Sequence, residues 1–288
     1  MAGGRTAGGR VARHRIGSRA FLVLLAAYFA LPLLAALLYS LATRWGDSAL
    51  PSGYTLTHWL NVFAKPEVSG ALGRSLLLSA AALAIDLVLV VPAAYWSVVR
   101  NPRIGSVVQT VAVIPFAIPW VVVGAGLQLV VKDALPALFG SFWLLAAATA
   151  AIAFPFLYWA VENSLLAADA ARLSEAAATC GAHPMTTLVR VVLPAIRGGI
   201  VSGSLLVVAT AMNEFALAKI LTGTRYETLP LWAARQFTSR TGSDPNALAV
   251  ITIFTFGLLF AMSALVVWLG RGRTAVATMA PARTTDKG

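Results

Sequence analysis

Residues 175–194 read EAAATCGAHPMTTLVRVVLP, and this stretch separates two much more apolar segments of the chain. Its apolar side chains recur at helical spacing on both sides of Gly181. They are Leu173, Ala176, Ala177 and Cys180 before the glycine, and Met185, Leu188, Val189 and Val192 after it. His183 and Pro184 suit the cap and the first position of a second helix, and Pro194 is predicted to end it. The pattern predicts two short amphipathic helices joined by a hinge. Helices of about ten residues are marginal alone in water, so we expect both apolar stripes to pack against something else.

The composition indicates a membrane protein. Apolar residues make up 59% of the chain and charged residues 11%, whereas a soluble domain has about 25% charged residues. Several apolar segments also reach the roughly 20 residues that cross a bilayer. The net charge of +11 comes from Arg and Lys in tails and between apolar segments, which does not favour nucleic-acid binding. The single cysteine, Cys180, excludes an internal disulfide and is expected to be a small packing residue.

The hydropathy pattern predicts an all-α membrane protein with six transmembrane helices. The predicted spans are residues 21–41, 71–99, 107–131, 142–162, 195–217 and 247–269. Residues 1–19 are rich in Gly and Arg and are predicted to be a disordered basic tail. The domain organisation is then a tail at 1–19, a six-span domain at 20–270 with residues 172–194 as a distinct region, and a second tail at 271–288.

The distribution of Arg and Lys predicts the orientation. More of these residues fall in the loops that would be cytoplasmic if the N-terminus is inside, and a cluster of arginines precedes the first span. Both termini and the stretch 175–194 are therefore predicted to be cytoplasmic. The two long external segments, 43–70 and 218–246, contain Trp45, Trp59 and Trp232. These tryptophans are predicted to be interfacial anchors or contacts to an external partner.

Proline interrupts the middle spans at Pro92, Pro115, Pro119 and Pro155. Each proline removes a backbone donor, and a freed carbonyl at membrane depth needs a neighbouring donor or a water-filled cavity. The broken spans favour a pathway through the protein, although kinks also serve helix packing.

Four polar residues fall inside or at the edges of predicted spans. Asp86 lies near the centre of the second span, where an ionised carboxylate costs roughly 3 kcal/mol. It can contact a cationic or hydroxyl-bearing substrate, serve as a proton site, or make a hydrogen bond between helices. Asn213 and Glu214 can line the outer half of a pathway or cap the end of the fifth span. Glu162 is expected at the membrane interface, at the inner end of the fourth span.

Several catalytic patterns are absent from the sequence. There is no G-x-x-x-x-G-K-[ST] phosphate loop, no H-E-x-x-H pair and no G-x-S-x-G elbow. The three histidines, His14, His58 and His183, lie too far apart in the predicted topology to share a metal. The sequence therefore predicts no catalytic residues, no metal site and no enzyme.

The stretch 175–194 resembles the cytoplasmic signature of the permease subunits of bacterial ABC importers that depend on a binding protein, the type I family with the EAA motif. The matching residues are Glu175, Ala176, Ala177, Gly181, Ala182, Leu193 and Pro194. The segments 75–100, 113–120 and 213–223 are similar to other parts of that family. The chain departs from the family pattern at Cys180 and Leu188, where an acidic and an aromatic residue are common.

This resemblance implies an architecture and a set of partners. Residues Glu175, Ala176, Ala177, Gly181, Ala182, Met185, Leu188, Leu193 and Pro194 would form a coupling-helix pair between spans four and five, seated on an ATPase. The complete transporter would contain two ATPase subunits, a second homologous or identical permease subunit and an extracytoplasmic binding protein. It would lie in the bacterial cytoplasmic membrane. The chain itself would hold no cofactor, and its partner ATPase would bind ATP and Mg²⁺.

The resemblance also indicates the substrate class. The external segments and residues 75–100 look most similar to permeases for small charged solutes such as polyamines, aminophosphonates or iron chelates, with Asp86, Asn213 and Glu214 as candidate pathway residues. A sugar or oligosaccharide importer is the alternative. A secondary transporter driven by an ion gradient would explain Asp86 and the kinks, but it gives the cytoplasmic helices no purpose. A polytopic membrane enzyme would need a catalytic cluster.

Overall fold

The computed structural model describes residues 7–46, 48, 50–238 and 244–277, and within these ranges it contains helices and no β-strand. The chain divides into two compact units. The first comprises Met1–Lys65 with Gln236–Phe256, and the second comprises Pro66–Arg235 with Gly257–Gly288. The site described below lies wholly in the second unit.

The first unit joins the end of the first helix to the start of the last one. It contains α1 (Ala7–Leu41), α2 (Thr57–Phe63) and the beginning of α11 (Pro245–Ala277). The side-chain amide of Asn246 donates hydrogen bonds to the carbonyl oxygens of Tyr39 at 3.3 Å and Ala42 at 3.0 Å. The rings of Phe63 and Phe254 meet at 4.9 Å. These contacts hold the loop after α1 against the first turns of α11.

The prediction of a disordered tail at residues 1–19 differs from the structure, because α1 begins at Ala7. Once a helix is nucleated within the apolar segment 21–41, extending it adds one hydrogen bond for each residue fixed, and Ala and Arg are good helix formers. The start of the predicted C-terminal tail at residue 271 also differs from the structure. Residues 271–277 continue α11, and residues 1–6 and 278–288 lie outside the described residues.

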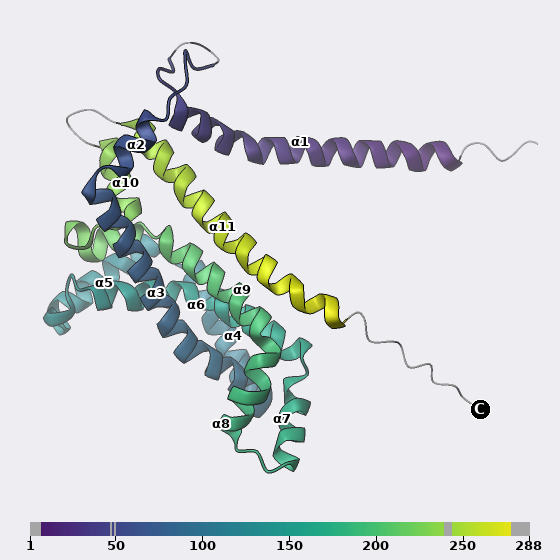
Figure 1. Ribbon diagram of the computed structural model, residues 1–288. Coiled ribbons are helices and arrows are strands. Elements are labelled where there is room, and N and C mark those ends of the chain that lie inside the picture. Colours follow the sequence, from purple (N-terminus) through teal and green to yellow (C-terminus); the bar gives the residue numbers. More distant parts are fainter. Residues whose placement is uncertain (1–6, 47, 49, 239–243, 278–288) are drawn as a thin grey trace, which may run out of the picture. The chain divides into compact units, whose positions relative to one another are not determined.

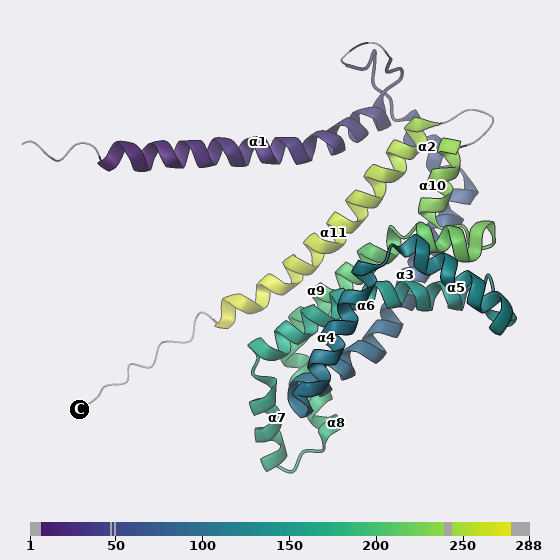
Figure 2. The ribbon, with the colours of Figure 1, turned by 180° about the vertical axis from the view of Figure 1, so that it is seen from behind.

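Three long helices form the core of the second unit. They are α3 (Pro66–Tyr95), α6 (Phe142–Ala167) and α9 (Leu193–Met212), which pack against one another pairwise (Figures 1 and 2). Ala82, Ala150 and Ala211 are buried together in a cluster to which each of these helices contributes one residue. Lipid gives apolar helices little hydrophobic reason to associate, so small residues that allow close backbone approach stabilise the contact.

The third predicted span, residues 107–131, is not one kinked helix. It consists of α4 (Pro102–Ala117) and α5 (Trp120–Ala134), which are bent by 98° at the break between them. Pro119 disfavours the helical conformation of the preceding residue, and Ile118 is extended with φ −114° and ψ 127°. Pro119 also cannot donate to the carbonyl of Pro115, which instead accepts a hydrogen bond from the indole of Trp120 at 3.2 Å. The tryptophan thus satisfies the carbonyl that the proline frees, as membrane depth requires.

The described residues contain five helices long and apolar enough to cross a membrane, or six if the bent pair α4 and α5 counts as one span. The fifth predicted span ends earlier than expected, since α9 stops at Met212 rather than at residue 217. A π-helical segment at Ala218–Thr222 and a 3₁₀ turn at Gly223–Tyr226 then lead into α10 (Leu229–Thr238). A further 3₁₀ turn, Pro136–Leu138, precedes α6.

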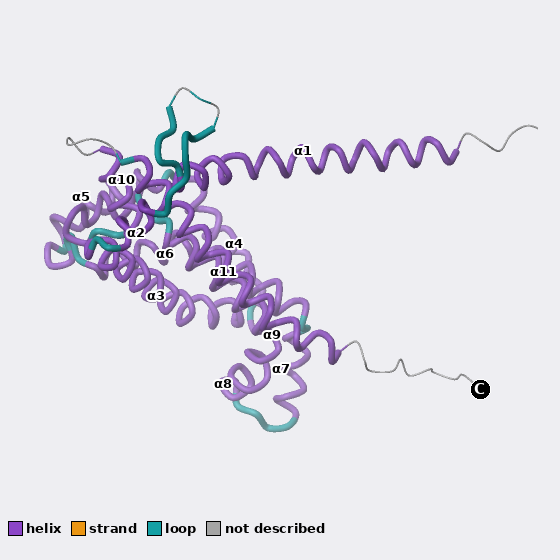
Figure 3. Tube along the Cα trace, turned by 45° about the horizontal axis from the view of Figure 1, so that its top comes forward, coloured by secondary structure: helices purple, strands orange, loops and turns teal. Residues whose placement is uncertain are grey.

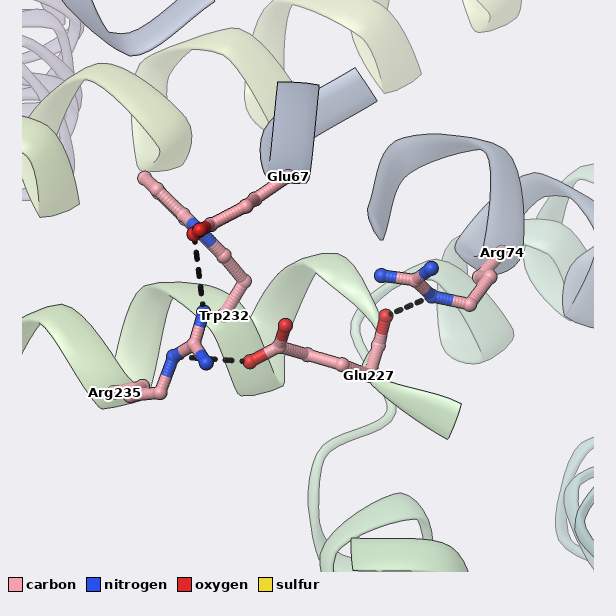
Figure 4. Close-up of polar contacts among 5 residues, drawn as sticks. All are labelled: Glu67, Arg74, Glu227, Trp232 and Arg235. Atoms are coloured by element: carbon pink, nitrogen blue, oxygen red, sulfur yellow. Dashed lines mark hydrogen bonds and ion pairs between the residues drawn. The ribbon is translucent and has the colours of Figure 1, made fainter. Parts of the chain in front are cut away.

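A cluster of charged side chains joins the start of α3 to α10 (Figure 4). Arg235 forms ion pairs with Glu67 at 3.3 Å and Glu227 at 3.1 Å, and Arg74 donates to the carbonyl of Glu227 at 2.6 Å. The indole of Trp232 donates to Glu67 at 3.4 Å, and its side chain is fully buried. Trp232 is therefore a core residue, and the prediction that it anchors at the interface or contacts an external partner is wrong.

Candidate functional site

Two short helices lie at one end of the three-helix core, as predicted for residues 175–194. They are α7 (Ala170–Thr179) and α8 (Pro184–Thr187), and a loop joins them (Figure 3). Helix α7 contacts two π-helical segments, Trp96–Arg100 after α3 and Leu188–Val192 after α8. The first short helix is therefore packed against the segment that follows α3 and the segment that precedes α9.

The loop at Gly181 has the geometry that glycine favours at the end of a helix. Gly181 has φ +78°, a conformation that costs other residues about 1–2 kcal/mol. The amide of Ala182 donates to the carbonyl of Ala177 at 3.0 Å, and the amide of Gly181 donates to Ala178 at 2.9 Å. This pair of bonds is a Schellman motif, and it satisfies two carbonyls that the helix end would leave free. The predicted hinge is thus a defined turn.

The start of the second helix is confirmed at the predicted residues. His183 is the cap, and its Nδ1 accepts a hydrogen bond from the amide of Met185 at 3.4 Å. Pro184 occupies the first turn, where its missing N–H costs no hydrogen bond. The direction of the chain entering α8 is fixed by these two residues.

The prediction that Pro194 ends this second helix is wrong. The chain is helical from Pro184 to Met212, through α8, the π-helical segment Leu188–Val192 and α9. A proline within a helix removes one hydrogen bond and crowds the preceding turn. The wider π-helical turn lies directly before Leu193 and Pro194, where the hydrogen-bond ladder has already shifted its register. The second short helix is therefore continuous with a long apolar helix, Pro184–Met212, that is long enough to cross a membrane.

The segment from Met185 to Ile196 presents two different apolar faces. Leu188, Val192 and Ile196 are buried in the core cluster. Met185 and Val189 lie on the other face, with 62% and 53% of their surface exposed. One face anchors the helix to the bundle, and the other leaves two adjacent apolar side chains accessible.

The residues of α7 that pack against the bundle are not the same set as the apolar stripe predicted from the sequence. Ala170 is buried and Leu173, Ser174 and Ala177 are half-buried, whereas Ala176 and Cys180 of the predicted stripe are exposed. The hydroxyls of Tyr95 and Ser174 lie 3.3 Å apart, which ties α7 to the end of α3. The exposed side of α7 carries Glu175 and Ala176 and is free of apolar residues larger than alanine.

The structure thus places the predicted coupling residues in one helix–turn–helix at the end of the bundle. Glu175, Ala176, Gly181, Met185 and Pro194 are exposed, Ala177, Ala182 and Leu193 are half-buried, and Leu188 is buried. We name the exposed apolar pair Met185 and Val189, together with Glu175 and Ala176, the outer face of this region. The name refers to side chains that are exposed and not to a side of the membrane. Whether a partner sits on it remains a prediction.

A buried polar network near this end was not predicted from the sequence. Glu162 accepts hydrogen bonds on Oε1 from the amide of Gln109 at 2.9 Å and from the hydroxyl of Tyr158 at 2.9 Å. The hydroxyl of Ser97 lies 3.5 Å from that of Tyr158. Glu162 is only 8% exposed, so it is not the interface residue that was expected. Its partner Gln109 is 53 positions away in the sequence, and no local pattern joins the two.

The three candidate pathway residues do not share one site. Asp86 lies in the wall of a groove formed by residues of α3, α4 and α6, and neither Asn213 nor Glu214 lines it. Glu214 is buried, and its carboxylate accepts from the amides of Leu217 and Ala218, both at 2.9 Å, so it caps the helical segment that follows. Burial raises the pKa of the Glu214 carboxyl, and the amide hydrogen bonds act in the opposite direction. Asn213 is exposed and donates to the carbonyl of Ala209 at 2.9 Å.

Comparison with protein families identifies the class to which this arrangement belongs. Residues 87–274 match the family described as binding-protein-dependent transport system inner membrane component. That range contains the helix–turn–helix, the bent pair α4 and α5, and α6 to α10.

Several curated proteins are similar to this chain. A putative 2-aminoethylphosphonate transport system permease protein PhnV from Salmonella choleraesuis is 27% identical over 269 residues, which cover 91% of this chain and 97% of that protein. The spermidine/putrescine permease PotC of Haemophilus influenzae is 33% identical over 128 residues, which cover 43% and 48%.

The fold agrees with a solved structure of the same class. A bacterial ABC transporter involved in the import of the acidic polysaccharide alginate superposes with a TM-score of 0.67 over 92% of this chain and 98% of that one, at 14% identity. This likeness supports the arrangement of the helices alone. From the family match and the helical membrane fold together, the chain belongs to the inner membrane components of binding-protein-dependent transport systems, the permeases of type I ABC importers.

Proposed function

We propose that this chain forms half of the pathway of an ATP-driven importer for a small charged solute. Two ATPase subunits would bind on the cytoplasmic side, a second permease subunit would complete the pathway, and an extracytoplasmic binding protein would deliver the solute. The outer face of the helix–turn–helix supports this function most directly. Met185 and Val189 are exposed there at the end of a helix long enough to cross the membrane, and Glu175 is exposed on the preceding short helix.

The outer face has the chemistry of a docking surface for the ATPase. Met185 is flexible and can fill an irregular hollow, and Val189 adds a second apolar contact one turn later. Glu175 is an exposed carboxylate that can pair with a basic residue. Movement of the partner would be passed inward through Leu188 and Val192, which are packed in the core. The ATPase would supply ATP and Mg²⁺, because this chain has no phosphate loop.

The single cysteine offers a test of the proposed orientation. Cys180 is exposed at the end of α7, and it is the one cysteine of the whole chain. With both termini and the helix–turn–helix in the cytoplasm, a membrane-impermeant maleimide should label inside-out vesicles and leave right-side-out vesicles unlabelled. A Cys180→Ser variant provides the background. Labelling of right-side-out vesicles alone would reverse the topology and remove the ATPase from this surface.

The substrate proposed is a small charged solute that carries an amine, such as an aminophosphonate or a polyamine. Nearly end-to-end similarity to permeases named for 2-aminoethylphosphonate supports this class, together with partial similarity to one named for spermidine and putrescine. We expect proteoliposomes that contain the chain, its ATPase and its binding protein to accumulate 2-aminoethylphosphonate or putrescine only when ATP is present.

The uptake assay has an internal comparison. An ATPase subunit mutated in its phosphate loop should abolish accumulation of either solute, and an oligosaccharide should not compete. Accumulation of oligosaccharide but of neither charged solute would contradict the substrate class and leave the importer assignment standing. Accumulation that an ion gradient drives without ATP would contradict the ATP-driven mechanism.

A further inference from the structure

A groove between α3 and α6 contains Asp86, a buried carboxyl whose place in the import function is unexplained. Its volume is about 370 Å³, and Val108 of α4 completes the wall that α3 and α6 provide. Leu89, Val90 and Phe154 are among its apolar lining residues, and Asp86 and Tyr158 are its polar ones. Small-molecule sites have volumes of about 300–1,000 Å³, so the groove suits a small solute.

Asp86 is buried but unsatisfied. Its side chain is 2% exposed, and among the described residues no hydrogen-bond partner reaches its Oδ2. The two arginines of the same helical stretch, Arg74 and Arg100, are 12 and 14 residues from Asp86, about 18 Å and 21 Å along the helix axis. An unsatisfied buried polar atom costs about 1–3 kcal/mol, and an unpaired charge costs more. The groove therefore holds an acceptor that the described part of the chain does not satisfy.

Tyr158, the other polar residue of the groove, is already engaged. Its hydroxyl donates to Oε1 of Glu162 at 2.9 Å. The groove thus offers an apolar wall with a single carboxyl and no basic side chain among its lining residues. A phosphonate or another oxyanion would meet repulsion from an ionised Asp86, and a sugar would find too few partners for its hydroxyls.

We propose that this groove binds a primary ammonium group at the end of a slim aliphatic chain, with the ammonium on Asp86 and the methylene groups against Leu89, Val90 and Phe154. The ion pair offsets the cost of burying the carboxylate, and the apolar wall covers the chain of the ligand. The proposal rests on the proposed import function, and it narrows the solute to one that enters the membrane amine first.

An ammonium group can also come from a lipid headgroup. Asp86 lies 20 residues from the start of α3, about 30 Å along the axis, and about 21 Å before Arg100 at its other end. Headgroups lie at the bilayer surface and not at this depth, which favours the soluble amine. The test separates the two sources by lipid composition.

The test measures equilibrium binding of radiolabelled 1,4-diaminobutane to the complete transporter in phosphatidylcholine nanodiscs. Wild type should bind the diamine saturably, and Asp86→Asn should weaken binding at least about tenfold. Ala151→Phe, which fills the groove from an exposed wall position and retains Asp86, should have the same effect. Thr149→Val is the matched control, because Thr149 is also buried with an unsatisfied hydroxyl but does not line the groove. It should bind like wild type.

Competition completes the experiment. Butane-1,4-diol and methylphosphonate should not displace the diamine. Absence of saturable binding in wild type, Asp86→Asn binding like wild type, or displacement by methylphosphonate would overturn the proposal. Loss of diamine binding in nanodiscs that contain phosphatidylethanolamine would assign the site to a lipid headgroup and overturn the solute site.

ATP-driven uptake by the same preparations distinguishes this proposal from the import function. Normal uptake of the diamine by Asp86→Asn would contradict the ammonium site at Asp86 but would not contradict the proposed import function. Diamine binding at Asp86 in a transporter that takes up no solute with ATP would retain the site and overturn the proposed function.

Discussion

Replacing Met185 and Val189 together with aspartate is expected to abolish ATP-driven uptake while the chain remains folded in the membrane. Both side chains are more than half exposed in the chain alone, so the change should cost little stability. Against an ATPase, each buried apolar side chain contributes about 1.5–3 kcal/mol, and a desolvated carboxylate costs several more. We therefore expect affinity for the ATPase to fall by about a thousandfold or more. Co-purification of the ATPase and uptake by proteoliposomes measure the two effects.

Two controls belong with this experiment. Met185→Leu with Val189→Ile keeps the surface apolar and should retain both co-purification and uptake. Leu50→Asp places a single carboxylate at an exposed apolar position, 64% accessible, in the loop after α1 and should leave the ATPase bound. If the ATPase co-purifies with the double aspartate variant as well as with wild type, and uptake is full, the proposal that the outer face binds the ATPase is contradicted.

Gly199→Ala is expected to destabilise the membrane domain strongly, whereas Gly198→Ala is expected to be neutral or stabilising. A Cβ atom on Gly199 would lie 2.5 Å from the carbonyl oxygen of Ala160 and would collide with the hydroxyl of Ser164, both in α6. The Ala160 oxygen is backbone, so α6 and α9 must separate to accommodate it. Overpacking typically costs about 1–3 kcal/mol, and this contact should reach or exceed the upper figure.

Gly198→Ala is the matched control for Gly199→Ala, because the two glycines are adjacent in α9. A Cβ on Gly198 would meet nothing within 4 Å, so alanine there should gain up to about 1 kcal/mol of helix propensity. Thermal unfolding in detergent and the amount of protein in the membrane measure both variants. Removing the Ser164 hydroxyl with Ser164→Ala should not rescue Gly199→Ala, because the Ala160 carbonyl remains. Equal melting temperatures for the two glycine variants would contradict the close approach of α6 and α9.

The sequence predicted the features that depend on neighbouring residues. Gly181, His183 and Pro184 determine a turn within four positions, so the helix–turn–helix could be placed before its surroundings were known. The same local rules failed where the backbone can respond to a proline in more than one way. Pro194 was expected to end a helix, but the π-helical turn before it accommodates the proline. Pro119 was expected to kink one span, and the structure instead turns the chain by 98°.

Contacts between distant residues were beyond any reading of spacing. The hydrogen bond between Gln109 and Glu162 joins α4 to α6 across 53 positions of sequence. Asp86 was singled out from the sequence because of its depth. The apolar surroundings that make its chemistry specific come from α4 and α6 and could be recognised only in three dimensions.

The continuous helix from Pro184 to Met212 has the form of a lever within the membrane domain. If its 29 residues move as one rod, the fulcrum lies at Gly199 and Gly203, where the helix backbone lies close against α6. The arm below the fulcrum is about 26 Å long and the arm above it about 17 Å. A sideways push at Met185, about 24 Å from the pivot, would then move Asn213, about 18 Å on its other side, in the opposite direction by about three quarters as much. The position of these two glycines would thus set the ratio between the movements at the two ends of the helix.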